Sequence, residues 1–166
     1  MKDLFVPRCI FVELSSEVLD LARELAARRG KSLEQFLADV LVKELDPVER
    51  VEVYLKLFEK YLSDAEELYK RADLVQAGEK YWGAVAALLS AIAERMGQAH
   101  YTHRDFWEIV ETLVEETKNP EYSTLFSLAE KLHANFYHGF LRKESFDKHR
   151  EGVLKLIEML KELLKS

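Results

Sequence analysis

The chain has 166 residues, of which 48% are hydrophobic and 33% charged, which is too apolar for disorder and too charged for a membrane span. Its net charge of −6 argues against a general phosphate-binding surface, because such surfaces carry a basic excess. The single cysteine, Cys9, excludes an internal disulfide framework and a cysteine zinc cage. The start, MKDLFVPRC, lacks the apolar run of a signal peptide, and no apolar stretch is long enough to cross a bilayer. We therefore expect a cytoplasmic protein with no membrane partner.

The first elements predicted are a short strand and two helices. Residues 8–14, RCIFVEL, are β-branched and aromatic, as is typical of a strand. Helical spacing predicts a helix from Ser15 or Ser16 to Gly30, and a Ser32–Gln35 capping box opens a second helix. A lone strand needs a partner for its backbone groups. We therefore expect a homodimer or higher homo-oligomer that forms through residues 8–14 and the following helices.

Five more helices are predicted from helical spacing and capping signals. The signals that open the first four of them are Asp46-Pro47, Asp73, Thr102 with Asp105, and Asn119-Pro120. The helix over 74–96 is apolar nearly all round between residues 81 and 93, which predicts the buried centre of a bundle. The last helix runs from about residue 143 to 164. The sequence thus predicts an all-α protein, with a strand-helix-helix dimerisation segment over residues 1–46 and a five-helix bundle over residues 47–166.

The start of the chain, IFVELSSEVLDLARELAARRGKSLEQFLADVLVKEL, resembles a ribbon-helix-helix module. That fold pairs two strands in a dimer and lays the resulting ribbon in the major groove of DNA. Strand residues alternate between faces, so the DNA-facing side here would hold Cys9, Phe11 and Glu13 in place of polar or basic side chains. We therefore expect this segment to dimerise without reading DNA.

Four segments of the remaining chain carry a second resemblance: DPVERVEVYLKLFEKYLSDAEEL, DLVQAGEKYWGAVAALLSAIAE, YTHRDFWEIV and LAEKLHANFYHGF. Over residues 47–165 the chain resembles the archaeal PaREP family (type one), a paralogous group of uncertain function that tends to carry a ribbon-helix-helix-like start as well. The resemblance implies a HEPN-like helical bundle. Many HEPN proteins are RNases of toxin–antitoxin or defence systems.

The HEPN resemblance implies His133, Asn135 and His138 as candidate catalytic residues. The RNase motif is an arginine followed, after four to six residues, by a histidine. In LHANFYHGF, His138 would be the motif histidine, His133 stands where the arginine belongs, and Asn135 lies one place late. An arginine supplies fixed positive charge for a phosphate transition state, whereas a histidine supplies it only when protonated. The alternative is that these residues cap and brace the helix end. Arg142 and His149, with six residues between them, also match the spacing of the RNase motif, but they lie at the start of the last helix, after the segment in which the motif is expected.

A second group of polar and aromatic residues makes a candidate ligand-binding site. Its members are Gln76, Glu79, Lys80, Trp82, His103, Trp107 and Tyr137. Polar groups at the mouth of an apolar helix can line a cleft, and the i, i+4 spacing lets the His103 imidazole stack near the Trp107 indole. With Lys80 and His133, these residues suit a small-molecule or nucleotide pocket. The alternatives are a helix that enters the core from solvent and a loop held by an aromatic lid.

These features favour an oligomeric interaction or ligand-binding module without chemistry of its own, with another protein or a small ligand as partner. One alternative is a HEPN-type metal-independent RNase or nucleotide-binding protein, with RNA or a nucleotide as ligand. Another is a DNA-binding regulator that acts through the ribbon, although the acidic strand face makes DNA a poor partner. We expect no metal and no cofactor, because the five histidines come without further cysteines or paired carboxylates.

Overall fold

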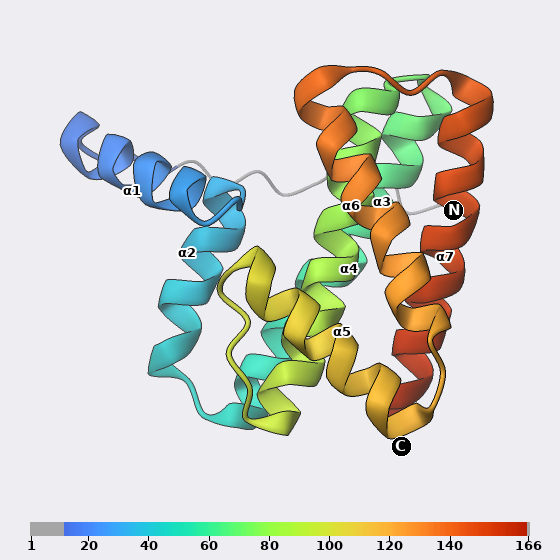
Figure 1. Cartoon of the computed structure of the whole chain (residues 1–166). Helices are drawn as coiled ribbons and strands as arrows, with labels where there is room; N and C mark the ends of the chain where they lie inside the picture. Colours follow the sequence, from blue (N-terminus) through green and yellow to red (C-terminus); the bar gives the residue numbers. More distant parts are fainter. Residues whose placement is uncertain (1–11, 166) are drawn as a thin grey trace, which may run out of the picture.

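The computed structural model describes residues 12–165. The chain is all-helical over this range (Figure 1). In chain order its helices are α1 (Ser16–Arg28), α2 (Leu33–Leu41), the 3-10 helix η1 (Val42–Glu44), α3 (Pro47–Lys70), α4 (Leu74–Met96), α5 (His103–Thr117), α6 (Glu121–His138) and α7 (Lys143–Lys165).

The expected strand-helix-helix segment followed by a five-helix bundle is wrong as a description of the fold. Residues 12–165 form seven α-helices and no strand, and residues 12–15 lead into α1 as irregular backbone. A strand requires a hydrogen-bonding neighbour, and the described part of the chain supplies none to residues 12–14. Residues 8–11 of the expected strand lie outside the described residues. The DNA-binding alternative, which needed a ribbon, therefore has no support in residues 12–165.

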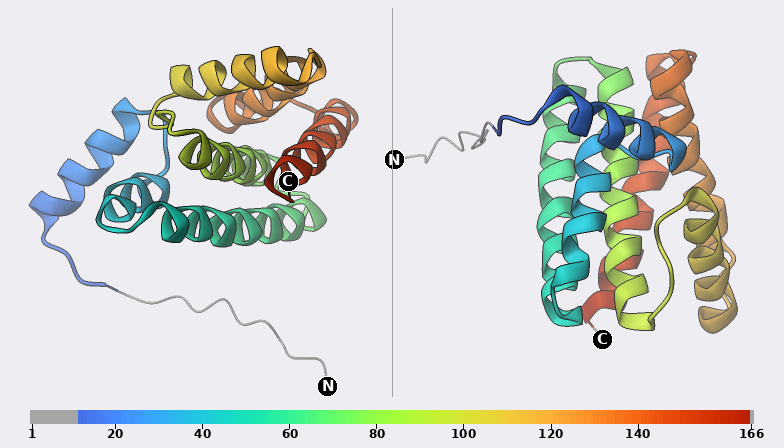
Figure 2. Two further views of the ribbon diagram at one scale, coloured as in Figure 1. Left: turned by 90° about the horizontal axis from the view of Figure 1, so that it is seen from below. Right: turned by 90° about the vertical axis from the view of Figure 1, so that its left-hand side faces the viewer.

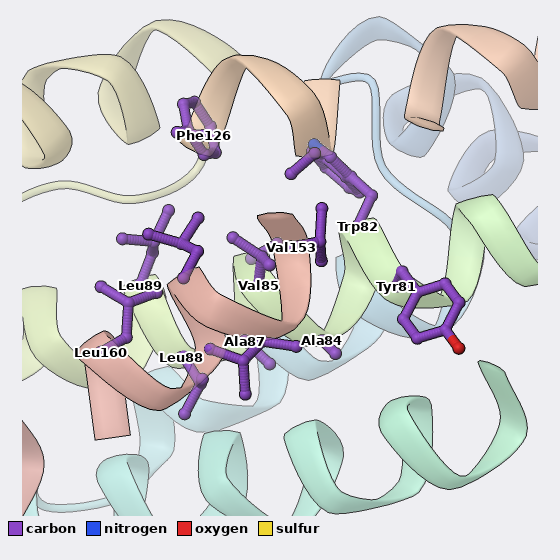
Figure 3. Close-up of a cluster of buried hydrophobic side chains, with 14 of the residues drawn as sticks. Tyr81, Trp82, Ala84, Val85, Ala87, Leu88, Leu89, Phe126, Val153 and Leu160 are labelled. Atoms are coloured by element: carbon purple, nitrogen blue, oxygen red, sulfur yellow. The ribbon is translucent and has the colours of Figure 1, made fainter. Parts of the chain in front are cut away.

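Helix α4 is the centre of the bundle, as its all-round apolar pattern predicts. It packs against α3, α5, α6 and α7, and every residue from Tyr81 to Ala93 is buried. Figure 3 shows the large side chains of α4 meeting Phe126 of α6 and Val153 and Leu160 of α7. Gly83 permits close packing here, because a Cβ at this position would lie 3.2 Å from the Gln35 amide nitrogen of α2.

Helices α1 and α2, with residues 12–15, form an arm on one side of the bundle; below, the arm means residues 12–41. Figures 1 and 2 show α1 projecting outward beyond α2. The face of α1 that carries Ala22 and Ala26 packs against Phe36 of α2 in a small separate core. The division of the chain at residue 46 into two domains stays a prediction.

Local capping explains most helix starts. The Ser32–Gln35, Asp46–Glu49 and Thr102–Asp105 pairs form reciprocal capping boxes at the starts of α2, α3 and α5. The predicted cap of α6 is displaced by one residue, since Pro120 occupies the cap position and the Asn119 side chain accepts the Glu121 N–H. None of the helices within residues 12–165 is long and apolar enough to cross a membrane.

Candidate functional site

Histidine and glutamate side chains gather around Trp82, at the junction of the bundle and the arm. The indole is fully buried and stacks on two imidazoles, with ring centroids 4.2 Å from His133 and 5.0 Å from His103, and the two imidazoles lie 5.1 Å from each other. Two carboxylates flank the stack. We call this group the Trp82 cluster; its members are Glu79 and Trp82 of α4, His103 of α5, and Glu130 and His133 of α6.

Hydrogen bonds to the two carboxylates fix the rings. One Glu130 oxygen accepts the Trp82 indole N–H at 2.8 Å and also lies 3.3 Å from Nδ1 of His103. The Glu79 carboxylate lies 2.6 Å from Nδ1 of His133. Burial alone would raise the pKa of Glu130, but the hydrogen bonds from His103 and Trp82 outweigh it and hold that pKa below its usual range. Glu130 therefore stays ionised in the cluster.

His103 connects the cluster to the arm. Its Nε2 lies 3.1 Å from the carbonyl oxygen of Gly30, in the turn between α1 and α2, while its Nδ1 faces Glu130. Both partners are acceptors, so only the protonated imidazolium can donate both bonds at once. The hydrogen bond to Glu130 raises the pKa of His103 against the opposing effect of burial, and the Gly30 carbonyl acts in the same direction. A charged His103 thus links the bundle to the arm.

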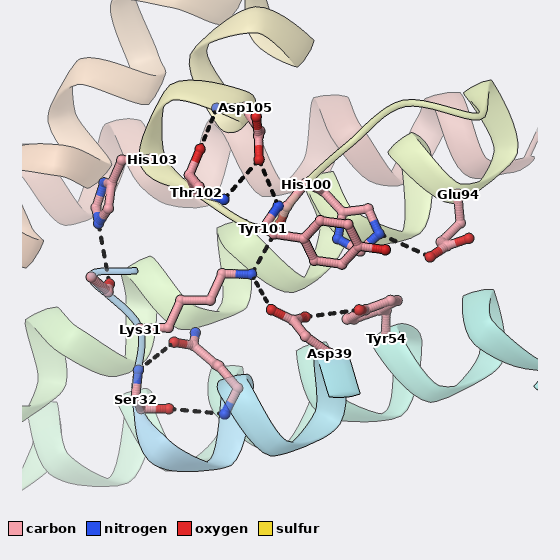
Figure 4. Close-up of polar contacts among 12 residues, drawn as sticks. Lys31, Ser32, Asp39, Tyr54, Glu94, His100, Tyr101, Thr102, His103 and Asp105 are labelled. Carbon is pink, nitrogen blue, oxygen red and sulfur yellow. Dashed lines mark hydrogen bonds and ion pairs between the residues drawn. The ribbon is translucent and has the colours of Figure 1, made fainter. Parts of the chain in front are cut away.

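A buried ion pair next to this contact also holds the arm (Figure 4). The Lys31 ammonium donates to the Asp39 carboxylate at 2.5 Å and to the carbonyl of His100 at 2.9 Å, and both side chains are almost completely buried. The other Asp39 oxygen accepts the hydroxyl of Tyr54 from α3 at 2.8 Å. Burial lowers the pKa of Lys31, and the Asp39 carboxylate opposes that shift. Lys31 and Asp39 thereby fix α2 to α3 and to the loop before α5.

The loop before α5 is itself held by a histidine–carboxylate pair. Nε2 of His100 lies 2.8 Å from Glu94 near the end of α4, and its ring meets Tyr54 edge-on at 5.2 Å. Arg50 of α3 pairs with the other oxygen of Glu94 at 3.5 Å. The loop is therefore held by the His100–Glu94 pair together with the Tyr54 ring.

Of the seven expected ligand-binding residues, the structure brings four together. Glu79, Trp82 and His103 belong to the Trp82 cluster, and the exposed Tyr137 ring meets His133 edge-on at 5.2 Å. The other three lie elsewhere. Gln76 is exposed on the first turn of α4, and Lys80 extends towards the Tyr61 ring and Asp64.

The expected stacking of His103 on Trp107 is wrong. Trp107 instead packs edge-on against Phe126 of α6, with ring centroids 4.7 Å apart, and His103 stacks on Trp82. The i, i+4 spacing makes the first pair neighbours along α5, but packing against α4 and α6 decides where each ring points.

The three candidate catalytic residues have three different environments. His133 is nearly buried and paired with Glu79. Asn135 is fully buried, and its carbonyl oxygen accepts the Leu141 N–H at 2.7 Å, which shapes the turn after α6. His138 is exposed at the last position of α6, which Gly139 then ends with a φ of 59°.

Arg142 and His149, the later pair with the motif spacing, also have different environments. Arg142 is exposed before α7, and Nδ1 of His149 lies 2.7 Å from the carbonyl of Ser145, one turn earlier in the same helix. No group of three or more histidine, cysteine, aspartate or glutamate side chains within residues 12–165 is arranged to hold a metal ion.

Several residues that define the junction were missed by sequence reasoning. No sequence pattern pointed to Glu130, because its partners His103 and Trp82 are 27 and 48 positions away. The Lys31–Asp39 pair was missed as well, because Asp39 lies beside the apolar stripe of α2 and not inside it, and the fold buries the side of α2 that carries Gln35 and Asp39 while Val40 and Leu41 stay exposed.

The comparison with protein families matches residues 53–157 to the archaeal PaREP1/PaREP8 family. The chain belongs to this family. The matched range runs from α3 into α7 and contains all five residues of the Trp82 cluster. It leaves out the arm. No curated protein and no solved structure matches the chain.

Proposed function

We propose that the chain is an interaction module that self-associates through its arm and performs no chemistry of its own. The observation that carries this proposal is the exposed aliphatic surface of the arm. Val18 and Leu21 of α1 are 54% and 57% exposed, and Leu41 of α2 is 66% exposed. Three further aliphatic side chains of the arm are exposed: Val12, Leu14 and Val40.

Covering this surface would stabilise the arm. Complete burial of a valine or leucine side chain contributes about 1.5–3 kcal/mol, so each half-exposed one offers about 1 kcal/mol to a partner. The arm's own core is small, since Ala22, Ala26 and Phe36 are its only buried hydrophobic members within the described residues.

The Trp82 cluster supports this proposal as a structural anchor. His103 and Lys31 hold the turn after α1 against the bundle, so α1 is presented in a fixed direction. A fixed direction lowers the entropy lost on association, because less of the interface must be ordered when the partner binds.

The RNase alternative rests on His133, Asn135 and His138, and their environments favour a structural role. An RNase needs a positive group and a general base that reach one phosphate. Here the Asn135 carbonyl oxygen is engaged by a backbone N–H and His133 by Glu79. A cleavage assay without added metal tests this alternative. RNA cleavage by the wild type that is lost in His138→Ala, with the molar mass unchanged, would replace our proposal.

Light scattering on matched variants tests the self-association directly. Leu21→Glu places a charge on the arm, and Phe140→Glu places one on an exposed aromatic side chain after α6. We expect Leu21→Glu to lower the molar mass to that of one chain, while Phe140→Glu leaves the mass of the wild type. Equal masses for all three proteins would contradict the proposal. Helical circular dichroism confirms that each variant is folded.

A further inference from the structure

The His103 ring lies between two acceptors that belong to different parts of the molecule. Its Nδ1 faces the Glu130 carboxylate of α6 at 3.3 Å, and its Nε2 faces the carbonyl oxygen of Gly30 in the arm at 3.1 Å (Figure 4). A ring that carries a single proton can donate to only one of them. The side chain is 31% exposed, so the ring can exchange protons with solvent. The geometry therefore couples the protonation of His103 to the contact between bundle and arm.

The two acceptors differ in strength, and this difference decides which bond is lost. A charge-assisted hydrogen bond to a carboxylate is roughly twice as strong as a bond between neutral groups. Burial would raise the pKa of Glu130, but hydrogen bonds from His103 and Trp82 hold it below its usual range, so Glu130 is ionised. A neutral His103 ring therefore keeps its proton on Nδ1. The Nε2 lone pair then faces the lone pairs of the Gly30 oxygen, and the bond to the arm is lost.

The other charged and titratable groups around this contact leave that order unchanged. They are Glu79 of α4, His133 of α6, Arg104 beside His103 on α5, and Arg29 and Lys31 on either side of Gly30. Glu79 favours the charged form of His103 and is itself bonded to His133. Each of the three cations already has a partner in its own segment, Glu108, Phe36 and Asp39 respectively. The contact at Gly30 thus follows the charge of His103 itself.

From this we infer that His103 is a pH-sensitive latch for the arm: the charged ring holds the turn after α1 against the bundle, and the neutral ring releases that turn while it stays bound to Glu130. Helix α1 packs mainly against α2, so the contact at Gly30 helps to fix its direction. Lys31 still bonds to the His100 carbonyl when the latch is open, so the arm loosens at its turn and does not detach. The inference goes beyond the proposed self-association and does not depend on it.

The latch closes in mildly acidic solution and opens as the pH rises. The hydrogen bond to Glu130 raises the pKa of His103 above its ordinary value of 6.5, although burial opposes this shift. Below that ordinary value the ring is charged and donates both bonds. As the pH rises through the raised pKa, the proton on Nε2 is lost.

Nuclear magnetic resonance of the wild-type protein tests the latch directly, because ¹⁵N shifts show which ring nitrogen carries a proton. We expect both nitrogens of His103 to be protonated at low pH and only Nδ1 at high pH. The carbonyl carbon of Gly30 should shift with the same midpoint, since it loses its hydrogen-bond donor. A neutral ring that keeps its proton on Nε2, or a Gly30 signal that does not follow His103, would overturn the inference.

Hydrogen exchange of backbone amides measures the consequence for the arm. Protection factors, which correct for the pH dependence of intrinsic exchange, should fall about tenfold in α1 between about pH 5.5 and 8, as expected for loss of a hydrogen bond to a charged group. Those of α7 should stay constant. In His103→Gln the protection of α1 should not change with pH, because the amide has no charge to lose. His149→Gln is the matched control and should behave as the wild type, since His149 bonds within α7 to the Ser145 carbonyl.

Light scattering at both pH values separates the latch from self-association. Equal protection of α1 at both pH values in the wild type would overturn the latch and leave the proposed self-association standing. A loss of protection that is the same in His103→Gln and accompanies a fall in molar mass would also overturn the latch, because dissociation would then explain it. A mass of one chain at both pH values, with the loss confined to proteins that retain His103, would support the latch without self-association.

Discussion

Removal of the Lys31 ammonium tests whether the arm is fixed to the bundle. Lys31→Met keeps the aliphatic stem but leaves the Asp39 carboxylate buried without its cation. The Lys31 and Asp39 side chains are only 3% and 2% exposed, so water cannot replace the lost partner. Breaking a buried pair in this way costs about 3–5 kcal/mol. That is a large fraction of the roughly 5–15 kcal/mol that stabilise a typical domain.

Urea unfolding followed by circular dichroism measures this cost, at one protein concentration because self-association adds to apparent stability. Lys165→Met is the matched control, since Lys165 pairs with Glu162 on the exposed surface of α7, where water screens the pair. Asp39→Asn in the Lys31→Met background should recover much of the loss, because it removes the unpaired charge and keeps an acceptor for Tyr54. If Lys31→Met costs no more than Lys165→Met, the pair is not buried in solution and the arm is not held as described.

Three further variants test the junction and the turn after α6. Gly30 and Gly97 both have a positive φ, so alanine costs roughly 1–2 kcal/mol at each, but only at Gly30 would the Cβ lie 2.5 Å from the His103 ring. Gly30→Ala should therefore lower the unfolding free energy by about 1–3 kcal/mol more than Gly97→Ala; equal losses would refute the contact. The folded pKa of His103 is raised, so its contribution to stability is complete below about pH 6.5 and is lost as the pH rises through the folded pKa. His103→Gln should flatten this decline in urea unfolding between mildly acidic and alkaline pH, and an unchanged profile would count against a charged His103. Asn135→Ala should cost about 1–3 kcal/mol, because it leaves the Leu141 N–H without its acceptor, and should leave the molar mass unchanged. A lower mass would place Asn135 in the interface instead.

Local signals predicted the helices well because they depend on neighbours in the sequence. The Ser32, Asp46 and Thr102 caps and the all-round apolar pattern of α4 each involve residues within a few positions. For residues 12–14, the part of the expected strand that the structure describes, the prediction failed because a short apolar run is compatible with more than one structure. In residues 12–14 the exposed aliphatic side chains belong to the irregular backbone that leads into α1.

The candidate site was predictable only in part, because local sequence signals do not show which distant segments pack together. Glu79 and Trp82 were singled out at the mouth of the apolar helix and His133 through the HEPN resemblance, and two helices, α4 and α6, bring them together. Their connection to Glu130 and to the Gly30 carbonyl depends on tertiary packing between distant segments. The sequence spacing of His103 favoured the wrong aromatic partner, because neighbours along one helix compete with neighbours from adjacent helices.

Sedimentation equilibrium of the wild-type protein over a range of concentrations tests the central claim, that the arm is a self-association surface. One chain has a mass of 19.3 kDa. The account predicts a species of twice that mass, and the combined Val18→Glu and Leu21→Glu variant should sediment as one chain with its helical signal intact. A wild-type protein that sediments as a single chain at every concentration would contradict the account.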